Sequence, residues 1–291
     1  MTHTSGTLPG GTAPETPGGD ASREPDLFWR LWRPDVPGGE VRAAVLLVHG
    51  IHEHSGRYAG VASRLMLRGI EVHAVDLRGH GESEGARGYV DRFEDYLGDV
   101  DRFVAHVREA GAATPRFMMG HSMGGLIAAT WWAERQPDDL DGLILSSPAL
   151  AIPPVNPLLQ AAAPFVSKRL PTFRVKPLDV SQLSRDPAVG RQYMEDPLVT
   201  AKGVMARTGY EIQQAGDRVR QRLGEFRAPL YLFHGTDDAI TDPAGTQRLA
   251  REAASGDVTL KLWDGLRHET MNEPERDDVI GAVADWVLAR A

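Results

Sequence analysis

The chain contains no cysteine, which excludes disulfide bonds and a thiol nucleophile. It also lacks any uncharged apolar run of membrane-spanning length that is free of multiple prolines. Basic residues are in the minority, with 32 Lys and Arg against 40 Asp and Glu, and the net charge is −8. The charges are interspersed and form no basic stripe, which argues against nucleic acid as a partner. A chain of 291 residues is nevertheless long enough to bury a large core.

The first 25 residues are rich in Gly, Pro and Thr and have almost no apolar side chains. This composition predicts a disordered leader over residues 1–25. The segment has neither a basic start nor an apolar core, so it does not have the pattern of a secretory signal peptide. A cytoplasmic location is therefore the default expectation.

A sharp turn is predicted around Ser122, the central residue of a G-x-S-x-G pattern with Gly120 and Gly124. An apolar run leads into the pattern at residues 116–119, and a helical pattern follows at 126–135. A serine on such a strand-to-helix turn has its hydroxyl exposed, and the glycines leave room for the neighbouring strand and helix. An ordinary turn is the alternative, but the pattern favours Ser122 as the nucleophile of an acyl-transfer reaction.

A serine nucleophile needs a base and an acid that orients the base. Only two histidines follow Ser122 in the sequence. His268 comes after a later strand-like run and is the candidate base, whereas His234 lies at the end of an earlier strand and is expected to be structural. Asp238 is favoured over Asp237 as the acid, because it lies further out on its loop and can turn toward His268.

Two backbone N–H groups are expected to bind the oxyanion that forms in acyl transfer. Met123 follows the nucleophile at the start of a predicted helix, whose dipole favours an anion. The second donor is assigned by position to Ile51, in the loop after a buried-strand pattern at residues 41–48. Loss of one such donor typically lowers the rate by about 10²–10³.

Strand and helix patterns alternate along most of the chain. Residues 28–32 and 41–48 are predicted to form an opening hairpin, and further strands at 70–75 and 143–145 are separated by helical patterns. This alternation predicts an α/β fold with a mostly parallel sheet and helices on both faces. Catalytic loops then lie at the carboxyl ends of the strands.

Residues 149–226, called the insert below, interrupt this alternation and divide the core into 26–148 and 227–291. The insert is punctuated by prolines, mostly helical in pattern and too long for a connecting loop, so it is predicted to be a helical cap over the active site. Its first stretch carries no charged residue. Two interpretations are compatible with each other: this stretch packs on the main domain, and Leu158 and Leu159 belong to an exposed apolar lip that contacts a membrane or micelle and guides acyl chains.

Several longer motifs accompany the turn at Ser122. They are Glu53-His54-Ser55-Gly56-Arg57-Tyr58, Asp76-Leu77-Arg78-Gly79-His80-Gly81-Glu82-Ser83, Ser184-Arg185-Asp186-Pro187, Asp196-Pro197-Leu198-Val199 and His268-Glu269 followed by Asn272-Glu273-Pro274. With these motifs, residues 27–291 resemble the monoacylglycerol lipase and lysophospholipase group of serine α/β-hydrolases. One departure is His52, which stands beside the proposed oxyanion donor where the group usually has a small residue.

The resemblance implies an α/β-hydrolase fold that cleaves medium- or long-chain monoacylglycerols to fatty acid and glycerol through an acyl-enzyme, without a cofactor. It also implies that Tyr193 and Glu195 meet the polar head of the substrate, with solvated helix surface as the alternative. Other candidate functions are a lysophospholipase, a general carboxylesterase, an acyltransferase and a non-catalytic ligand-binding receptor. His52 and His54 have no evident third ligand, so loop bracing is favoured over metal binding.

Overall fold

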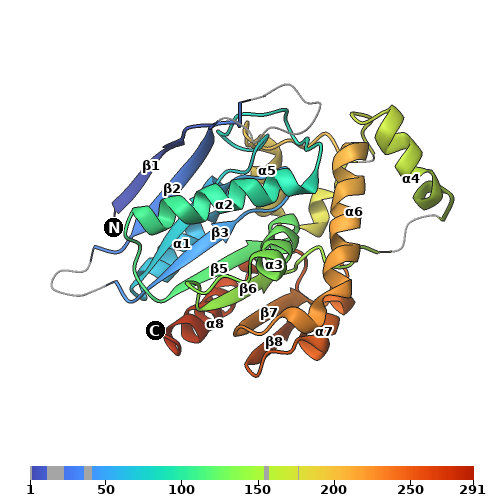
Figure 1. The fold of residues 1–291 in the computed structure, drawn as a ribbon. Coiled ribbons are helices and arrows are strands. Elements are labelled where there is room, and N and C mark those ends of the chain that lie inside the picture. Colours follow the sequence, from blue (N-terminus) through green and yellow to red (C-terminus); the bar gives the residue numbers. More distant parts are fainter. Residues whose placement is uncertain (1, 12–22, 36–40, 154–156, 176) are drawn as a thin grey trace.

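A mostly parallel sheet forms the centre of the molecule (Figure 1). The computed structural model describes residues 2–11, 23–35, 41–153, 157–175 and 177–291. The strands in these residues are β1 (Thr2–Leu8), β2 (Leu27–Arg33), β3 (Ala43–Val48), β4 (Ile70–Val75), β5 (Arg116–His121), β6 (Gly142–Ser146), β7 (Leu230–Gly235) and β8 (Val258–Trp263). They form one sheet in the order β1-β2-β4-β3-β5-β6-β7-β8. The pairs β1–β2 and β2–β4 are antiparallel, and the other pairs are parallel.

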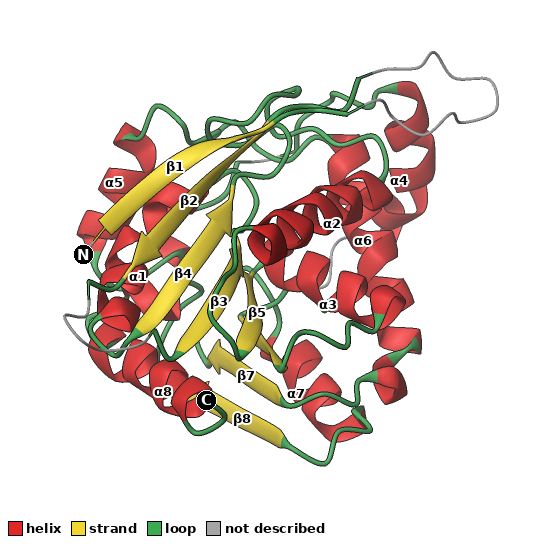
Figure 2. Cartoon of the chain, turned by 60° about the vertical axis from the view of Figure 1, so that its left-hand side comes forward, coloured by secondary structure: helices red, strands yellow, loops and turns green. Residues whose placement is uncertain are grey.

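Helices cover both faces of this sheet (Figure 2). They are α1 (Ala59–Met66), α2 (Phe93–Glu109), α3 (Met123–Arg135), α4 (Pro157–Arg169), α5 (Pro187–Glu195), α6 (Ala206–Gln221), α7 (Pro243–Glu252) and α8 (Arg276–Leu288), with the short 3-10 helices η1 (Ser55–Tyr58), η2 (Val180–Gln182), η3 (Leu223–Glu225) and η4 (Thr270–Asn272). Helices α1 and α8 pack on one face, and α2, α3 and α7 pack on the other. The α/β class predicted from the sequence is confirmed.

Strand β3 shows how the sheet positions the loops at its carboxyl end. Val45 and Leu47 belong to the core on the side of α1 and α8, whereas Leu46 and Val48 belong to the core on the side of α2 and α3. Successive side chains of a strand point to opposite faces, so a strand covered on both faces is apolar at every position. In the parallel register Val48 lies opposite Gly120 of β5, which brings the loop after β3 beside the turn at the end of β5.

The opening hairpin predicted from the sequence is wrong. Strand β2 pairs antiparallel with β4, and β3 lies between β4 and β5. Both hydrogen-bonding edges of β3 are thus occupied by parallel partners, which leaves no edge for β2. Residues 37–39, expected as the hairpin turn, lie outside the described residues.

The disordered leader predicted over residues 1–25 is wrong for residues 2–8, which form β1 at the edge of the sheet. Every residue of β1 pairs with one of β2, from Thr2 opposite Arg33 onward. The side chains of β1 are mostly polar and exposed, so its backbone ladder and local contacts hold it, such as His3 stacked on Trp32 at 5.2 Å. A strand without apolar alternation gives no compositional signal. Residues 12–22 lie outside the described part of the chain.

The insert between β6 and β7 contains α4, α5 and α6. Helix α6 packs against α3, and its Ile212, Ala215 and Val219 belong to the larger core. Helix α4 contacts α6 and lies at the outside of the molecule (Figure 1). Within the described residues, none of the helices combines the length and the apolar character needed to cross a membrane.

Candidate active site

Ser122 lies at a sharp turn between β5 and α3. Its φ of 54° and ψ of −120° hold a residue with a side chain in a sparsely populated backbone region, which costs of order 1–3 kcal/mol. A Cβ atom on Gly120 would lie 2.4 Å from the carbonyl oxygen of Gly124, and one on Gly124 would lie 2.2 Å from that of Val48. Both glycines are therefore required by the close approach of α3 to the strands.

Three side chains meet at the carboxyl end of the sheet. Ser122 Oγ lies 2.9 Å from His268 Nε2, and His268 Nδ1 lies 2.7 Å from Asp238 Oδ2. All three residues are buried, whereas the alternative acid, Asp237, is exposed. The structure thus brings together the serine, histidine and aspartate that the sequence singles out, with Asp238 rather than Asp237 beside the histidine.

Asp238 is held in a buried hydrogen-bond network. Its Oδ1 accepts the backbone N–H groups of Ile240 and Thr241 at 2.8 and 3.0 Å. Its Oδ2 accepts the Thr241 hydroxyl at 2.9 Å and lies 2.9 Å from His234 Nε2. Burial disfavours the charged carboxylate, but hydrogen bonds from His234 and the attraction of His268 hold the pKa of Asp238 well below its usual range. Asp238 is therefore an anion at neutral pH, able to orient the imidazole and stabilise its charged form.

The loop after β3 runs directly beside the nucleophile. A Cβ atom on Gly50 would lie 3.2 Å from Ser122 Cβ, so the backbone of this loop contacts the turn. Ile51 is the next residue along the loop. Met123 is the first residue of α3, where backbone N–H groups have no acceptor within the helix. Both N–H groups expected as oxyanion donors thus come from segments that adjoin Ser122.

His49 fixes the start of this loop. The Leu77 N–H donates to His49 Nε2 at 3.0 Å, and His49 Nδ1 donates to the Gly50 carbonyl oxygen at 2.7 Å. Because Nε2 accepts a hydrogen bond, the imidazole is neutral, and burial lowers the pKa of His49 accordingly. The loops after β3 and β4 are joined through this ring.

His52 has a φ of 64° and is 2 % exposed. A left-handed backbone disfavours large side chains. This explains why the group that the sequence resembles usually has a small residue at the position of His52. The His52 carbonyl accepts the Thr200 N–H of the insert at 3.0 Å, and the imidazole lies against Gly88. Its Nε2 has no hydrogen-bond partner among the described residues, and burial lowers the pKa of His52 to about 4.

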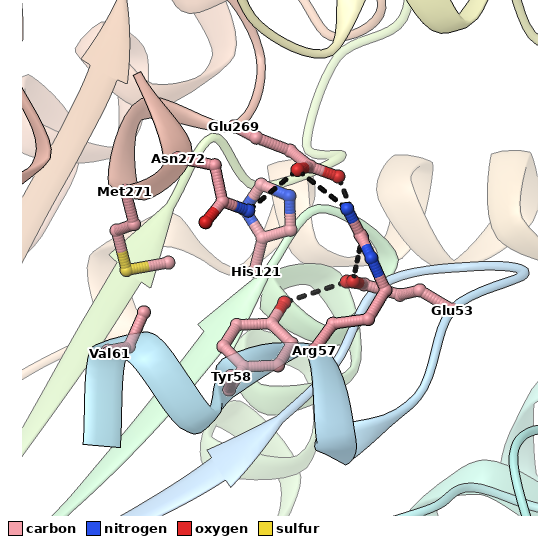
Figure 3. Close-up of a pocket in the computed structure, with 8 residues that line it drawn as sticks. All are labelled: Glu53, Arg57, Tyr58, Val61, His121, Glu269, Met271 and Asn272. Atoms are coloured by element: carbon pink, nitrogen blue, oxygen red, sulfur yellow. Dashed lines mark hydrogen bonds and ion pairs between the residues drawn. The ribbon is translucent and has the colours of Figure 1, made fainter. Parts of the chain in front are cut away.

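Figure 3 shows a buried ion-pair cluster beside His121. The cluster adjoins the three side chains through the chain, because His121 precedes Ser122 and Glu269 follows His268. Arg57 Nη1 lies 2.5 Å from Glu53 Oε2 and 2.8 Å from Glu269 Oε1, and Arg57 Nη2 lies 2.9 Å from Glu269 Oε2. His121 lines the same small pocket, and its ring centroid lies 4.8 Å from that of His268. Burial lowers the pKa of His121 to about 4, so this ring is neutral beside the histidine that would act as base.

The four expected substrate contacts lie in different surroundings. Tyr193 is buried, and the Arg57 guanidinium carbon lies 4.9 Å from the centroid of its ring. Glu195 is exposed at the end of α5. Leu158 is 79 % exposed on α4, whereas the side chain of Leu159 lies outside the described part of the structure. Tyr193 therefore adjoins the ion-pair cluster, and Leu158 lies on the outer surface.

Loop bracing accounts for His54, whose Nε2 lies 2.9 Å from Asp196 Oδ2 in the insert. Across the residues that the structure describes, no group of three or more His, Cys, Asp or Glu side chains could hold a metal ion.

The sequence singled out neither Thr241 nor Glu269 as part of the site. The motif His268-Glu269 contained a signal for Glu269, but its partner Arg57 is 212 residues away in the chain.

Comparisons with known proteins cover nearly the whole chain. The family model described as serine aminopeptidase, S33 (Hydrolase_4), matches residues 39–275. A monoacylglycerol lipase from Mycolicibacterium smegmatis is 36% identical over 90% of this chain and 93% of that protein. A monoglyceride lipase from Homo sapiens is 35% identical over 91% of this chain and 87% of that protein. The solved structure of a monoacylglycerol lipase from Paleococcus ferrophilus matches with a TM-score of 0.80 and 32% identity, over 91% of this chain and 99% of that chain.

Proposed function

The chain belongs to the serine aminopeptidase S33 family (Hydrolase_4), and from this premise we propose that it hydrolyses monoacylglycerols to fatty acid and glycerol. The observation that carries the proposal is the array of Ser122, His268 and Asp238, whose successive polar atoms lie 2.9 and 2.7 Å apart. The substrate class is taken from the monoacylglycerol lipases to which the chain is similar over almost its full length.

Acylation begins when Ser122 Oγ attacks the ester carbonyl and His268 Nε2 takes its proton. Asp238 stays ionised and stabilises the imidazolium. The carbonyl oxygen becomes an oxyanion, which accepts hydrogen bonds from the N–H groups of Ile51 and Met123. Collapse of this intermediate breaks the ester bond, glycerol leaves with the proton from His268, and the acyl group remains on Ser122.

Deacylation repeats these steps with water as the nucleophile. His268 takes a proton from water as the water oxygen attacks the acyl carbonyl, and the same two N–H groups bind the second oxyanion. The proton then returns to Ser122 Oγ as the fatty acid leaves. One set of residues therefore supports both halves of the reaction.

The first part of the insert is the proposed contact with lipid aggregates. Leu158, Phe165 and Leu170 are 79, 66 and 56 % exposed, and Lys168 and Arg169 end helix α4 among them. Further exposed apolar side chains in this part are Ile152, Phe173 and Val175. Apolar side chains flanked by cations suit the boundary between water and a lipid aggregate. This surface supports a peripheral association through which the substrate enters.

The proposal is tested by assaying the purified protein on 1-monoacylglycerols of several chain lengths. Lysophosphatidylcholine, p-nitrophenyl butyrate and alanine p-nitroanilide are assayed in parallel, with Ser122→Ala as the control. We expect the highest kcat/KM on a monoacylglycerol and a loss of roughly 10⁴-fold or more in Ser122→Ala, because no nucleophile remains. A preference for lysophosphatidylcholine or for the anilide would overturn the substrate assignment, and turnover by Ser122→Ala would overturn the mechanism.

A further inference from the structure

One buried guanidinium joins the two loops that carry the proposed oxyanion donor and the base (Figure 3). On one side, Glu53 Oε1 accepts the Gly50 N–H at 2.7 Å, so this carboxylate holds the backbone next to Ile51. On the other side, Glu269 is the residue that directly follows His268. Arg57 contacts both carboxylates at the distances given above. A continuous line of hydrogen bonds thus links the loop after β3 to the loop after β8.

We propose that Arg57 and Glu269 are positioning residues, which set the place of His268 relative to the oxyanion donor Ile51. This inference rests on the proposed function and assigns these two residues a role in the same reaction. Catalytic groups act only within a narrow geometry, and a misplacement of about 1 Å can lower the rate about 10²-fold. The loops after β3 and β8 are far apart in the sequence, so the chain itself does not fix the distance between them. Side-chain contacts such as that of Arg57 with Glu269 help to fix it.

The contacts of the cluster leave its members little freedom to move. Besides Gly50, Tyr58 donates its hydroxyl to Glu53 Oε1 at 2.7 Å, and the Asn272 amide donates to Glu269 Oε2 at 2.7 Å. Each carboxylate oxygen therefore has a partner. Glu53 and Glu269 are both buried, and a bidentate guanidinium–carboxylate pair fixes orientation as well as distance.

Electrostatics favour the charged form of the cluster. Burial opposes ionisation of Glu53, but attraction to Arg57 and further contributions, among them the hydrogen bond from Tyr58, together outweigh it and hold the pKa of Glu53 at about 2. The cluster thus contains one cation and two anions. Removal of the Glu269 charge still leaves a matched pair, whereas removal of the Arg57 charge would leave two buried carboxylates face to face. Glu269→Gln is therefore the informative variant, because it leaves no buried charge without a partner of opposite sign.

The experiment compares Glu269→Gln with the unmodified protein on a monoacylglycerol and on p-nitrophenyl butyrate, together with the rate of inactivation by a fluorophosphonate. We expect kcat to fall about ten-fold on both esters, with KM changed less than two-fold, because the base is displaced from the oxyanion donor. The inactivation rate should fall by the same factor. Arg57→Lys should behave alike, and the double variant should be no slower than the slower single variant.

Glu71→Gln provides the matched control. Glu71 is a buried carboxylate near the amino end of β4, where it pairs with the Arg33 guanidinium at 2.9 Å and accepts the Ala113 N–H at 2.7 Å, whereas the site lies at the carboxyl ends of the strands. We expect its kcat to stay within two-fold of the unmodified protein.

Three results would overturn the inference. One is a raised KM for the monoacylglycerol with unchanged turnover of p-nitrophenyl butyrate, which would make Arg57 and Glu269 binding residues for the glycerol head. Another is a lowered melting temperature with unchanged kcat, which would make them structural. The third is an equal loss of kcat in Glu71→Gln. Failure of the proposed function would show differently, as absent turnover by the unmodified protein or persisting turnover by Ser122→Ala.

Discussion

Two parts of the insert are attached to the protein in different ways. They are called the α4 half (residues 149–175) and the α5 half (residues 177–205), and α6 follows them and packs in the core. The half around α4 exposes large apolar side chains such as Leu158 and Phe165 to solvent. The half around α5 is joined to the loops of the site by polar contacts, which are Glu269 N–H to Leu183 O at 2.7 Å, Arg185 N–H to Glu273 Oε2 at 2.9 Å, His54 Nε2 with Asp196 Oδ2 at 2.9 Å, and Thr200 N–H to His52 O at 3.0 Å.

This difference separates two tasks within one segment. The α5 half contacts the loop after β3 and the loop after β8, so it is part of the frame that holds the site. The α4 half contacts α6, and its outer side chains contribute little to folding because they remain in water. We therefore expect stability to depend on the α5 half and interfacial activity to depend on the α4 half.

The largest expected effect is the loss of the α5 attachment through Glu273. Its carboxylate is fully buried and accepts the Arg267 and Arg185 N–H groups and the Ser184 hydroxyl. Glu273→Ala leaves the two N–H groups without an acceptor and removes the contact with the Arg185 guanidinium, which should lower the free energy of unfolding by about 3–5 kcal/mol. Urea unfolding measures this loss. Hydrogen exchange should show that residues 180–200 lose protection while the protection of α4 is unchanged. An equal loss of protection in both halves would contradict the difference between them.

A somewhat smaller effect is expected from acid, through His52 beneath the α5 half. Its pKa is about 4 in the folded protein against 6.5 for an unperturbed histidine, because burial disfavours the charged ring. Above pH 6.5 the His52 ring is neutral in both the folded and the unfolded protein, so its titration does not reduce the free energy of unfolding. As the pH falls from 6.5 to 4 the unfolded state binds the proton first, so stability falls by at most about 3 kcal/mol.

The variant His52→Asn isolates this term, since asparagine tolerates a left-handed backbone and does not titrate. Urea unfolding at several pH values between 7 and 4.5 gives the free energy of unfolding as a function of pH. In His52→Asn this free energy should fall less steeply with acid, by the contribution of one proton. The remaining pH dependence comes from other groups whose pKa is lowered by folding, such as His121 and Glu53, with pKa values of about 4 and about 2. An unchanged slope would show that His52 is not buried as a neutral ring.

The parts of the site that depend on local pattern could be predicted from the sequence. Ser122 lies in a turn whose glycines are required by its own geometry, and the order of Ser122, Asp238 and His268 along the chain narrowed the choice of acid and base. The parallel core followed from apolar runs such as β3. These features involve neighbouring residues or single strands, so their physical causes are visible in short stretches of sequence.

Features that depend on distant partners could not be predicted. Strand β1 is held by its ladder with β2 rather than by apolar side chains, so its composition indicated disorder. The pairing of Arg57 with Glu269 joins residues 212 positions apart and requires the folded sheet. The prediction of an opening hairpin failed for the same reason. The partners of β3 are β4 and β5, which come later in the chain, and a short stretch of sequence does not show that they occupy its edges.

The smallest effect on stability, and the clearest division between the two halves, is expected from Leu158→Asp on α4. Leu158 is 79 % exposed, so the substitution should change the free energy of unfolding by less than about 0.5 kcal/mol. A charge at the proposed lipid contact should nevertheless weaken adsorption, because the carboxylate would have to leave water at the lipid surface. Activity on micellar monoacylglycerol should therefore fall several-fold while turnover of dissolved p-nitrophenyl butyrate is unchanged.

Leu67→Asp is the matched control for this prediction. Leu67 is 71 % exposed at the end of α1, outside the insert, and its replacement removes a similar apolar area and adds the same charge. It should leave activity on both substrates unchanged. An equal loss in both variants would trace the effect to net charge, and unchanged micellar activity in Leu158→Asp would remove the lipid contact from α4. The α5 half would in either case keep its place as the attached half, since its contacts involve neither leucine.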